Sequence, residues 1–284
     1  MWQRSVSAIG VVIVGLVPAL LGGPIFAVVF TAIALLAFRE LLPLVGLTNR
    51  NLALSGALLI VMAMVLAWSA PDSRYLALQM ALTLLVPFAI ALFTPTTISD
   101  RRDWPVMIGV TMYLVLPTFA AISLRGTEGE VDRAWFQSLA NAMPGSDRTA
   151  EGLGLLVMAV LITWMSDTAA YLVGKSMGHT RLIPRISPNK TVEGAIGGLV
   201  AAAITAVVCV VAFGLAINPL AAVVFGIVAG AIGILGDLGE SMIKRRAGAK
   251  DSGTLIPGHG GILDRIDALI FVLVTTWALL PLLT

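Results

Sequence analysis

Charged side chains gather in one short segment near the C-terminus of a chain that is otherwise strongly apolar. The segment runs from Ser241 to Asp267 and reads SMIKRRAGAKDSGTLIPGHGGILDRID. Cationic side chains bind phosphate groups, and carboxylates are oxygen ligands suited to Mg²⁺. Apolar stretches flank the segment on both sides, so charge placed there carries a desolvation cost. We therefore expect these residues to do chemistry on a phosphate-bearing substrate.

The apolar stretch before this segment carries a patterned helix face. Small and then charged residues recur at intervals of three or four, which places them on one side of a helix: Gly226, Gly230, Gly233, Asp237, Glu240 and Lys244. Glycines allow a neighbouring helix to approach closely. The carboxylates beyond them are therefore expected to emerge into a groove within the protein, and Asp237 is expected to begin the site.

A helix beginning near Leu263 is expected to carry two acids, Asp264 and Asp267, in its first turn. The helix dipole favours carboxylates there, which explains one acid better than two. The preceding run from Gly258 to Gly261, which includes His259 and Gly260, permits the sharp turn and close approach that a bound phosphate requires. We predict that Asp237 and Asp264 hold one divalent cation between two helix ends.

A second group of polar residues lies upstream. Asp167 falls inside an apolar stretch, where a charge costs roughly 2.5–3.5 kcal/mol, so it needs a polar cavity or a hydrogen bond to a neighbouring helix. Ser187 and Pro188 form a suitable N-cap and first-turn pair for the next helix. Lys190 and Thr191 are left near that helix N-terminus, where a cation is disfavoured unless it meets an anion such as phosphate.

Other polar residues have simpler explanations. His179 and His259 are candidates for acid, base or ligand, but each can equally donate a structural hydrogen bond. Arg39 and Glu40 are interpreted as an interfacial pair at a helix end rather than as catalytic groups. The only cysteine, Cys209, excludes an internal disulfide or a cysteine metal site.

The elements that position these residues are expected to be membrane-spanning helices. The chain is 58% hydrophobic and 12% charged, with mean hydropathy +0.96, which excludes a water-soluble domain. This composition predicts an all-α polytopic integral membrane protein, and the first stretch is interpreted as a span rather than a cleaved signal peptide. The nine predicted spans are Val6–Leu21, Ile25–Val45, Leu52–Trp68, Tyr75–Phe93, Trp104–Leu124, Gly152–Val173, Glu193–Ile217, Pro219–Gly236 and Ile262–Leu283.

The distribution of basic residues predicts the orientation. With the N-terminus in the cytoplasm, all Lys and Arg residues except Arg74, Arg125, Arg133 and Arg148 fall on the cytoplasmic side. The chain then divides into five helices over residues 1–124, an extracytoplasmic loop over 125–151, and four helices over 152–284. The last part carries two cytoplasmic polar connections, 174–192 and 239–261. Walker, dinucleotide-binding, metalloprotease and nucleophile-elbow motifs are absent from the sequence, which leaves phosphoryl or nucleotidyl transfer to a lipid.

At these residues the chain resembles the phosphatidate cytidylyltransferase, or CDP-diacylglycerol synthase, family. The C-terminal signature of that family is filled at Ser241, Lys244, Arg245, Lys250, Asp251, His259, Gly260, Gly261, Asp264, Arg265 and Asp267. Upstream, Asp167, Ala170, Tyr171, Gly174 and the run from Ser187 to Gly194 are also similar. Asn189 stands where a lysine is commoner. Before residue 125 the similarity is limited to hydropathy and Glu40.

The resemblance implies that CTP reacts with phosphatidic acid from the bilayer to give CDP-diacylglycerol and pyrophosphate, with Mg²⁺, alone or with a second cation. It also implies a cytoplasm-facing site in the plasma (inner) membrane, no nucleic-acid partner, and a homodimer. Catalytic roles are expected for Asp167, Asp237, Lys244, Arg245 and Asp264. Substrate contacts are expected from Ser187, Lys190, Thr191, Ser241, Lys250, His259, Gly260, Gly261 and Arg265.

Two alternatives use some of the same residues. A CTP-dependent lipid kinase would transfer the γ-phosphate rather than the cytidylyl group. A membrane transporter would explain Asp167 and the glycine-lined helix, but its charges should lie near the membrane midplane instead of in two connections on one side.

Overall fold

The computed structural model describes residues 15–69, 74–93, 103–143, 149–258 and 260–283. Most of this part of the chain is helical, and eight of its helices are long and apolar enough to cross a membrane. The prediction of an all-α polytopic membrane protein is thus confirmed. Most of the predicted first span, Val6–Leu21, lies outside the described residues; the helical residues 15–21 are its end.

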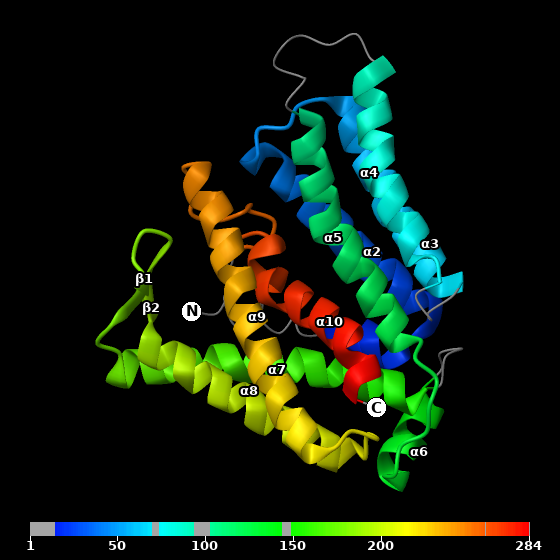
Figure 1. Ribbon diagram of the computed structural model, residues 1–284, viewed down its shortest axis with the longest axis vertical. Coiled ribbons are helices and arrows are strands. Elements are labelled where there is room, and N and C mark those ends of the chain that lie inside the picture. Colours follow the sequence, from blue (N-terminus) through cyan, green and yellow to red (C-terminus); the bar gives the residue numbers. More distant parts are fainter. Residues whose placement is uncertain (1–14, 70–73, 94–102, 144–148, 259, 284) are drawn as a thin grey trace.

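The first four described spans form one bundle, drawn in blue to green in Figure 1. They are α2 (Gly23–Leu44), α3 (Arg50–Ser69), α4 (Leu76–Phe93) and α5 (Asp103–Arg125). α5 lies at the centre of this bundle, packed against α2, α3 and α4, and most of its residues are buried. α5 also contacts α7 and α10, so it joins this bundle to the C-terminal helices.

The remaining helices cross one another below and beside that bundle (Figure 1). α7 (Ala150–Met177) and α8 (Val192–Phe213) pack along each other, α9 (Pro219–Arg246) packs on α8, and α10 (Leu263–Leu283) lies against α9 and α5. A short helix, α6 (Ala134–Ala142), precedes α7 and stacks Phe136 on Phe213 at the end of α8. α10 therefore has neighbours in both halves of the protein.

Two of these helices are longer than the apolar stretches predict. α7 and α9 each have 28 residues, although about 20 suffice to span a bilayer. α9 continues ten residues past the predicted end at Gly236. Its charged residues follow the glycines at the same intervals of three and four, so they lie on the same face of one continuous helix. The charged end of α9 is thus held on a rigid helix, and Lys244 lies in its last turn.

A β-hairpin connects α7 to α8 and projects beyond their ends (Figure 1). Its strands, β1 (Arg181–Ile183) and β2 (Ser187–Thr191), pair antiparallel with Arg181 opposite Thr191. The prediction that Ser187 and Pro188 cap the next helix is wrong, because both lie in β2. The N-cap is Thr191, whose Oγ1 accepts a hydrogen bond from the Gly194 amide at 3.1 Å.

Close helix packing explains this later start. A Cβ at Gly178 would lie 2.2 Å from the Gly174 carbonyl oxygen and 2.7 Å from Thr191 Oγ1, and a Cβ at Gly194 would lie 2.7 Å from the Ala170 carbonyl oxygen. The ends of α7 and α8 therefore meet through glycines, and this contact places the first turn of α8 at Val192. The chain before it remains extended and pairs with β1.

The helix ends sort into two groups, as the predicted topology requires. At one end Glu40 of α2 contacts Ile262, and Lys190 of β2 contacts Asp237 of α9. At the other end the Arg125 side chain donates to Thr149. The two polar connections predicted to share one side, 174–192 and 239–261, thus lie at the same end of the molecule.

Candidate functional site

The glycine face of α9 packs closely against two helices, as predicted. A Cβ at Gly226 would lie 2.6 Å from the Ala202 carbonyl oxygen of α8, and a Cβ at Gly233 would lie 3.1 Å from Val272 Cγ2 of α10. The face therefore meets α8 first and α10 further along. The charged residues that follow emerge beside α10 and the hairpin.

Lys244 links α9 to α10 through two carboxylates. Its Nζ contacts Glu240 Oε2 one helical turn earlier and donates to Asp264 Oδ1 at 2.6 Å. Lys244 is 9% exposed and Glu240 is fully buried. Neither Glu240 oxygen has another hydrogen-bond partner among the described residues. Among the described residues, the Lys244 ammonium group is therefore the only cation in contact with the buried Glu240 carboxylate.

Asp264 also organises the glycine-rich turn before α10. Its Oδ2 accepts hydrogen bonds from the Ser252 amide, the Ser252 hydroxyl and the Gly261 amide, at 2.8–2.9 Å. Gly260 has φ +82° and Gly258 has φ +77°, the left-handed conformation that glycine adopts without strain. The predicted sharp turn is therefore present at these glycines. His259 lies outside the described residues.

Asp237 of α9 contacts the β-hairpin through an ion pair. Lys190 of β2 forms an ion pair with Asp237 Oδ2, and both side chains are 28% exposed. Ser241 Oγ donates to Asp237 Oδ1 at 3.4 Å. The ion pair accounts for Lys190 near a helix N-terminus, because a carboxylate from α9 compensates its charge. It also brings the hairpin to the charged end of α9, although the two are far apart in the sequence.

Further carboxylates surround Asp237. Asp167 of α7 and Asp267 of α10 both lie within electrostatic range of it, and Asp167 is also close enough to Lys190 to interact. Asp167 is exposed rather than sealed among apolar helices. Three helices contribute acids to one region, with Lys190 as a cation among them.

Other predicted residues lie at the edge of this region. Arg245 and Lys250 are exposed, and the Arg245 guanidinium donates to the Ala249 carbonyl at 3.1 Å. Ser187 is half-buried in β2, and Thr191 is occupied as the α8 cap. His179 is exposed, and its Nδ1 lies 2.7 Å from the Met177 carbonyl, which agrees with the structural hydrogen-bond alternative.

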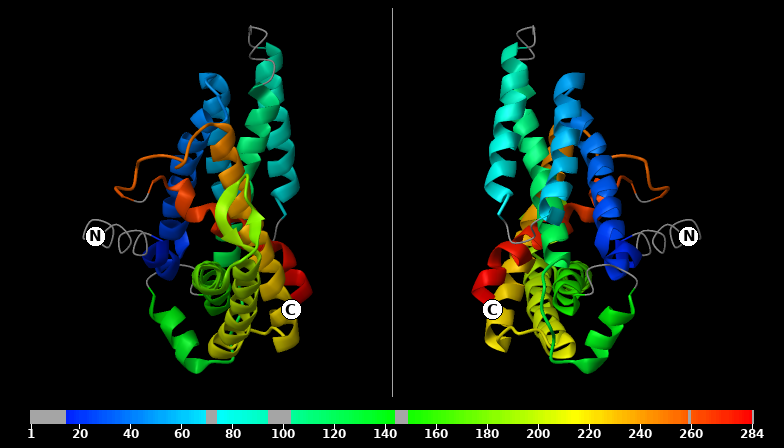
Figure 2. Two further views of the ribbon diagram at one scale, coloured as in Figure 1. Left: turned by 90° about the vertical axis from the view of Figure 1, so that its left-hand side faces the viewer. Right: turned by 90° about the vertical axis from the view of Figure 1, so that its right-hand side faces the viewer.

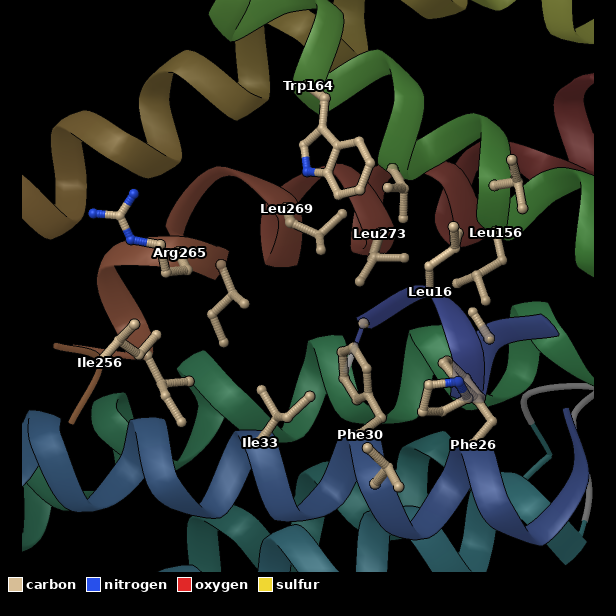
Figure 3. Close-up of a pocket in the computed structure, with 18 of the residues that line it drawn as sticks. Leu16, Phe26, Phe30, Ile33, Leu156, Trp164, Ile256, Arg265, Leu269 and Leu273 are labelled. Carbon is tan, nitrogen blue, oxygen red and sulfur yellow. The ribbon is translucent and has the colours of Figure 1, made fainter. Parts of the chain in front are cut away.

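Arg265 is separated from the acids. It lies on the other side of α10, at one end of an apolar cavity of about 390 Å³ (Figure 3). Figure 3 shows Ile256 near the same end, Leu16 and Phe26 toward the other end, and Trp164 of α7 pointing into the space. Among the described residues that line this cavity, Arg265 is the only one with a charged side chain. A long apolar chain with an anionic head is the kind of ligand that such a lining fits.

Sequence reasoning missed three polar groups, two in helices and one in the connection between α9 and α10. Glu40 is buried and accepts hydrogen bonds from the start of α10, so its interpretation as an interfacial pair with Arg39 is wrong. Ser252 lies between Glu40 and Asp264. The Tyr113 hydroxyl of α5 is buried, lacks a hydrogen-bond partner among the described residues, and lies within electrostatic range of Asp267. An acid or tyrosine in an apolar stretch was the available signal for two of them.

Comparison with known proteins identifies the family of the chain. The profile of the Cytidylyltransferase family matches residues 2–283. A protein named phosphatidate cytidylyltransferase from Staphylococcus saprophyticus is 47% identical over 124 residues, which is 44% of this chain and 48% of the relative. Its namesake from Staphylococcus aureus is 48% identical over the same shares of both chains. The matched region thus spans about half the length of these curated relatives. Because the family profile extends over nearly all of this chain, the chain belongs to the cytidylyltransferase family.

Proposed function

We propose that this protein transfers the cytidylyl group of CTP to phosphatidic acid, giving CDP-diacylglycerol and pyrophosphate for phospholipid synthesis. One observation carries the proposal: two lysines from different connections, Lys190 and Lys244, are held on carboxylates at one end of a membrane-spanning bundle. An apolar cavity with one arginine lies across α10 from them. The lysines that would bind phosphate and the cavity that would hold a lipid chain thus lie on adjacent sides of α10. The names of the relatives agree with this reaction.

The chemistry follows from these charges. An oxygen of the lipid phosphate attacks the α-phosphorus of CTP, and the bond from that phosphorus to pyrophosphate breaks. A phosphate monoester is already anionic at neutral pH, so this attack needs no general base. Negative charge grows on the leaving pyrophosphate, where fixed cations stabilise it. Lys190 and Lys244 are suited to this task because substrate phosphates can replace their present carboxylate partners.

A magnesium ion fits the same residues. No three His, Cys, Asp or Glu side chains converge into a preformed metal site within the described part of the chain. However, Asp167, Asp237 and Asp267 together carry three potential negative charges, against Lys190 in the ion pair with Asp237 and Lys244 within electrostatic range of Asp267, a surplus that a divalent cation compensates. We propose that Asp237 and Asp264 hold Mg²⁺, as the sequence predicts, when CTP binds. The ion would supply charge stabilisation on the phosphates.

We also propose that the end of the molecule with Lys190 and Asp237 faces the cytoplasm at the inner membrane. The excess of Lys and Arg on this side supports the orientation. CTP would then reach the site from water, while phosphatidic acid enters from the bilayer with an acyl chain in the cavity beside Arg265. The predicted homodimer remains a family-level expectation, which a mass measurement in detergent will test.

Labelled CTP tests the reaction. Purified protein is incubated with phosphatidic acid, Mg²⁺ and CTP labelled at either the α- or the γ-phosphate, with a metal-chelated control. Label from the α-position in lipid supports the proposal. Label from the γ-position instead would show a lipid kinase, and no lipid label with either CTP would refute both.

A variant of Asp264 tests the site. Asp264→Asn is expected to abolish product formation while the protein stays folded and membrane-inserted, because the Lys244 partner and a predicted metal ligand are lost together. Asp132→Asn is the matched control, since Asp132 is exposed at the opposite end of the molecule. Retained activity of Asp264→Asn would refute the metal assignment.

A further inference from the structure

Glu40 of α2 reaches the polar end of the molecule from the N-terminal half of the chain, in which the sequence predicts no catalytic or substrate-binding residue. It is 8% exposed. Its Oε1 accepts a hydrogen bond from the Ile262 amide, and its Oε2 accepts from the Leu263 amide, each at 3.0 Å. These amides begin α10, so a side chain more than 220 positions earlier in the sequence caps that helix.

The same carboxylate holds the connection between α9 and α10, residues 247–262, which we call the α9–α10 loop. Ser252 Oγ lies 3.0 Å from Glu40 Oε2 and 2.9 Å from Asp264 Oδ2. A hydroxyl has one proton, so Ser252 shares it between the two carboxylates. In the side views of Figure 2 the loop stands out from the helices on the side of α2. Ser252 connects Glu40 directly to a predicted metal ligand.

Two glycines show how closely the loop surrounds this carboxylate. A Cβ at Gly253 would lie 2.7 Å from Glu40 Oε1, and a Cβ at Gly261 would lie 2.3 Å from Glu40 Oε2. Because real Cβ atoms do not approach so closely, the backbone at both positions fits Glu40 only without a side chain. The loop and Glu40 are therefore mutually complementary at four points: Ser252, the two glycines and the start of α10.

We infer that Glu40 is a positioning residue for the transfer reaction proposed above. By capping α10 and holding Ser252, it fixes the place of Asp264 relative to α9 and Lys244. The inference rests on the proposed function for its catalytic consequence. The clamp on the loop can be tested without any activity measurement.

Kinetics of Glu40 variants provide the first test. Glu40→Ala is expected to lower kcat about 100-fold, the effect of a displacement of about 1 Å at a reacting group. Glu40→Gln keeps an oxygen for one α10 amide and should recover at least about tenfold of that loss. Glu130→Gln, at an exposed site, is the matched control and should behave as the wild type. If kcat per folded molecule in Glu40→Ala equals that of the wild type, the inference is overturned.

A double-mutant cycle locates the route of the effect. If Glu40 acts through its bond to Ser252, combining Glu40→Ala with Ser252→Ala should lower kcat no more than about twofold beyond the more damaging single change. Fully multiplicative losses would show that the two residues act independently and would overturn the proposed connection.

Limited proteolysis tests the clamp itself. Lys250 is exposed in the α9–α10 loop, so trypsin cleavage after it, identified by mass spectrometry, reports loop opening. Glu40→Ala should be cleaved at least about tenfold faster than wild type and Glu130→Gln at the wild-type rate. Equal rates for Glu40→Ala and wild type would refute the clamp. If the wild type makes no CDP-diacylglycerol yet cleavage depends on Glu40, the proposed function fails and the clamp stands without a role in transfer.

Discussion

Removal of the Lys244 ammonium should separate the stability of this protein from its activity. In Lys244→Met the side chain keeps its approximate length and loses its charge. Asp264 retains the Ser252 and Gly261 donors, so its carboxylate stays compensated. Glu240 retains no hydrogen-bond partner among the described residues and is fully buried. The cost of the substitution therefore falls on Glu240.

The expected magnitude follows from that isolated carboxylate. Removing one partner of a buried ion pair costs about 3–5 kcal/mol, because the other charge stays desolvated. At about 2–4 °C per kcal/mol for a chain of this size class, the unfolding midpoint should fall by roughly 6–20 °C. The double variant Lys244→Met/Glu240→Met replaces both partners with apolar groups. It should return to within about 1 kcal/mol of the wild type, because no buried charge is left unpaired.

The single cysteine provides the assay. Cys209 is 2% exposed and free, so a thiol-reactive fluorogenic dye reports unfolding of detergent-solubilised protein as it is heated. All variants are compared at one heating rate, because unfolding of membrane proteins is often irreversible. CTP-dependent product formation is measured on the same samples. Both variants should be inactive, since the double change restores stability without restoring the cation that meets phosphate.

Two results would refute the reasoning. If Lys244→Met unfolds at the wild-type temperature, then Glu240 has another partner or is neutral. That result would refute the role of the Lys244 ion pair in compensating a buried Glu240 charge. If the double variant is stable and also active, Lys244 has no part in binding phosphate.

Three further predictions concern the site and the packing that supports it. Lys190→Gln should raise the KM for CTP about 10- to 100-fold, which is the value of a charge-assisted hydrogen bond. The loss in stability should be under about 1 kcal/mol, because the ion pair of Lys190 is partly exposed. Lys175→Gln, which changes an exposed lysine of α7, is the kinetic control. Gly226→Ala should destabilise the protein by about 1–3 kcal/mol in the dye assay because of its contact with α8, whereas Gly239→Ala, with nothing within 4 Å, should be neutral or stabilising. Leu269→Trp should fill the apolar cavity and raise the KM for long-chain phosphatidic acid about tenfold without changing the KM for CTP, and an unchanged lipid KM would place the acyl chain elsewhere.

The spacing of residues on α9 predicted the local structure well. Intervals of three and four from Gly226 to Lys244 indicated one helix face, and that face packs on α8 and α10 before it becomes charged. Such a pattern is readable because helical periodicity is a local property. The same locality explains the error at Ser187 and Pro188, which have the residue types of a helix start. Pairing with β1 and the glycine contacts between α7 and α8 moved that start to Val192.

Glu40 illustrates what local pattern cannot reveal. An acid near a helix end beside Arg39 is usually interfacial, and its partners, the amides of Ile262 and Leu263, are backbone groups without a sequence signal of their own. Tyr113 is similar, because an amphipathic side chain in an apolar helix does not indicate which helix it faces.

The sequence by itself determined the class of the protein, and it predicts the side of the membrane on which its charges gather and the residues that bind phosphate and metal. Composition and charge distribution suffice for these because transfer of apolar and charged groups between water and lipid depends on residue type. Only the tertiary structure decided which charges meet. Lys190 pairs with Asp237, Lys244 joins Glu240 to Asp264, and Glu40 holds the loop beside them. Apart from Glu240 and Lys244, which are one turn apart on α9, these partners come from different helices and loops, and side-chain contact at a few ångströms depends on how those helices pack.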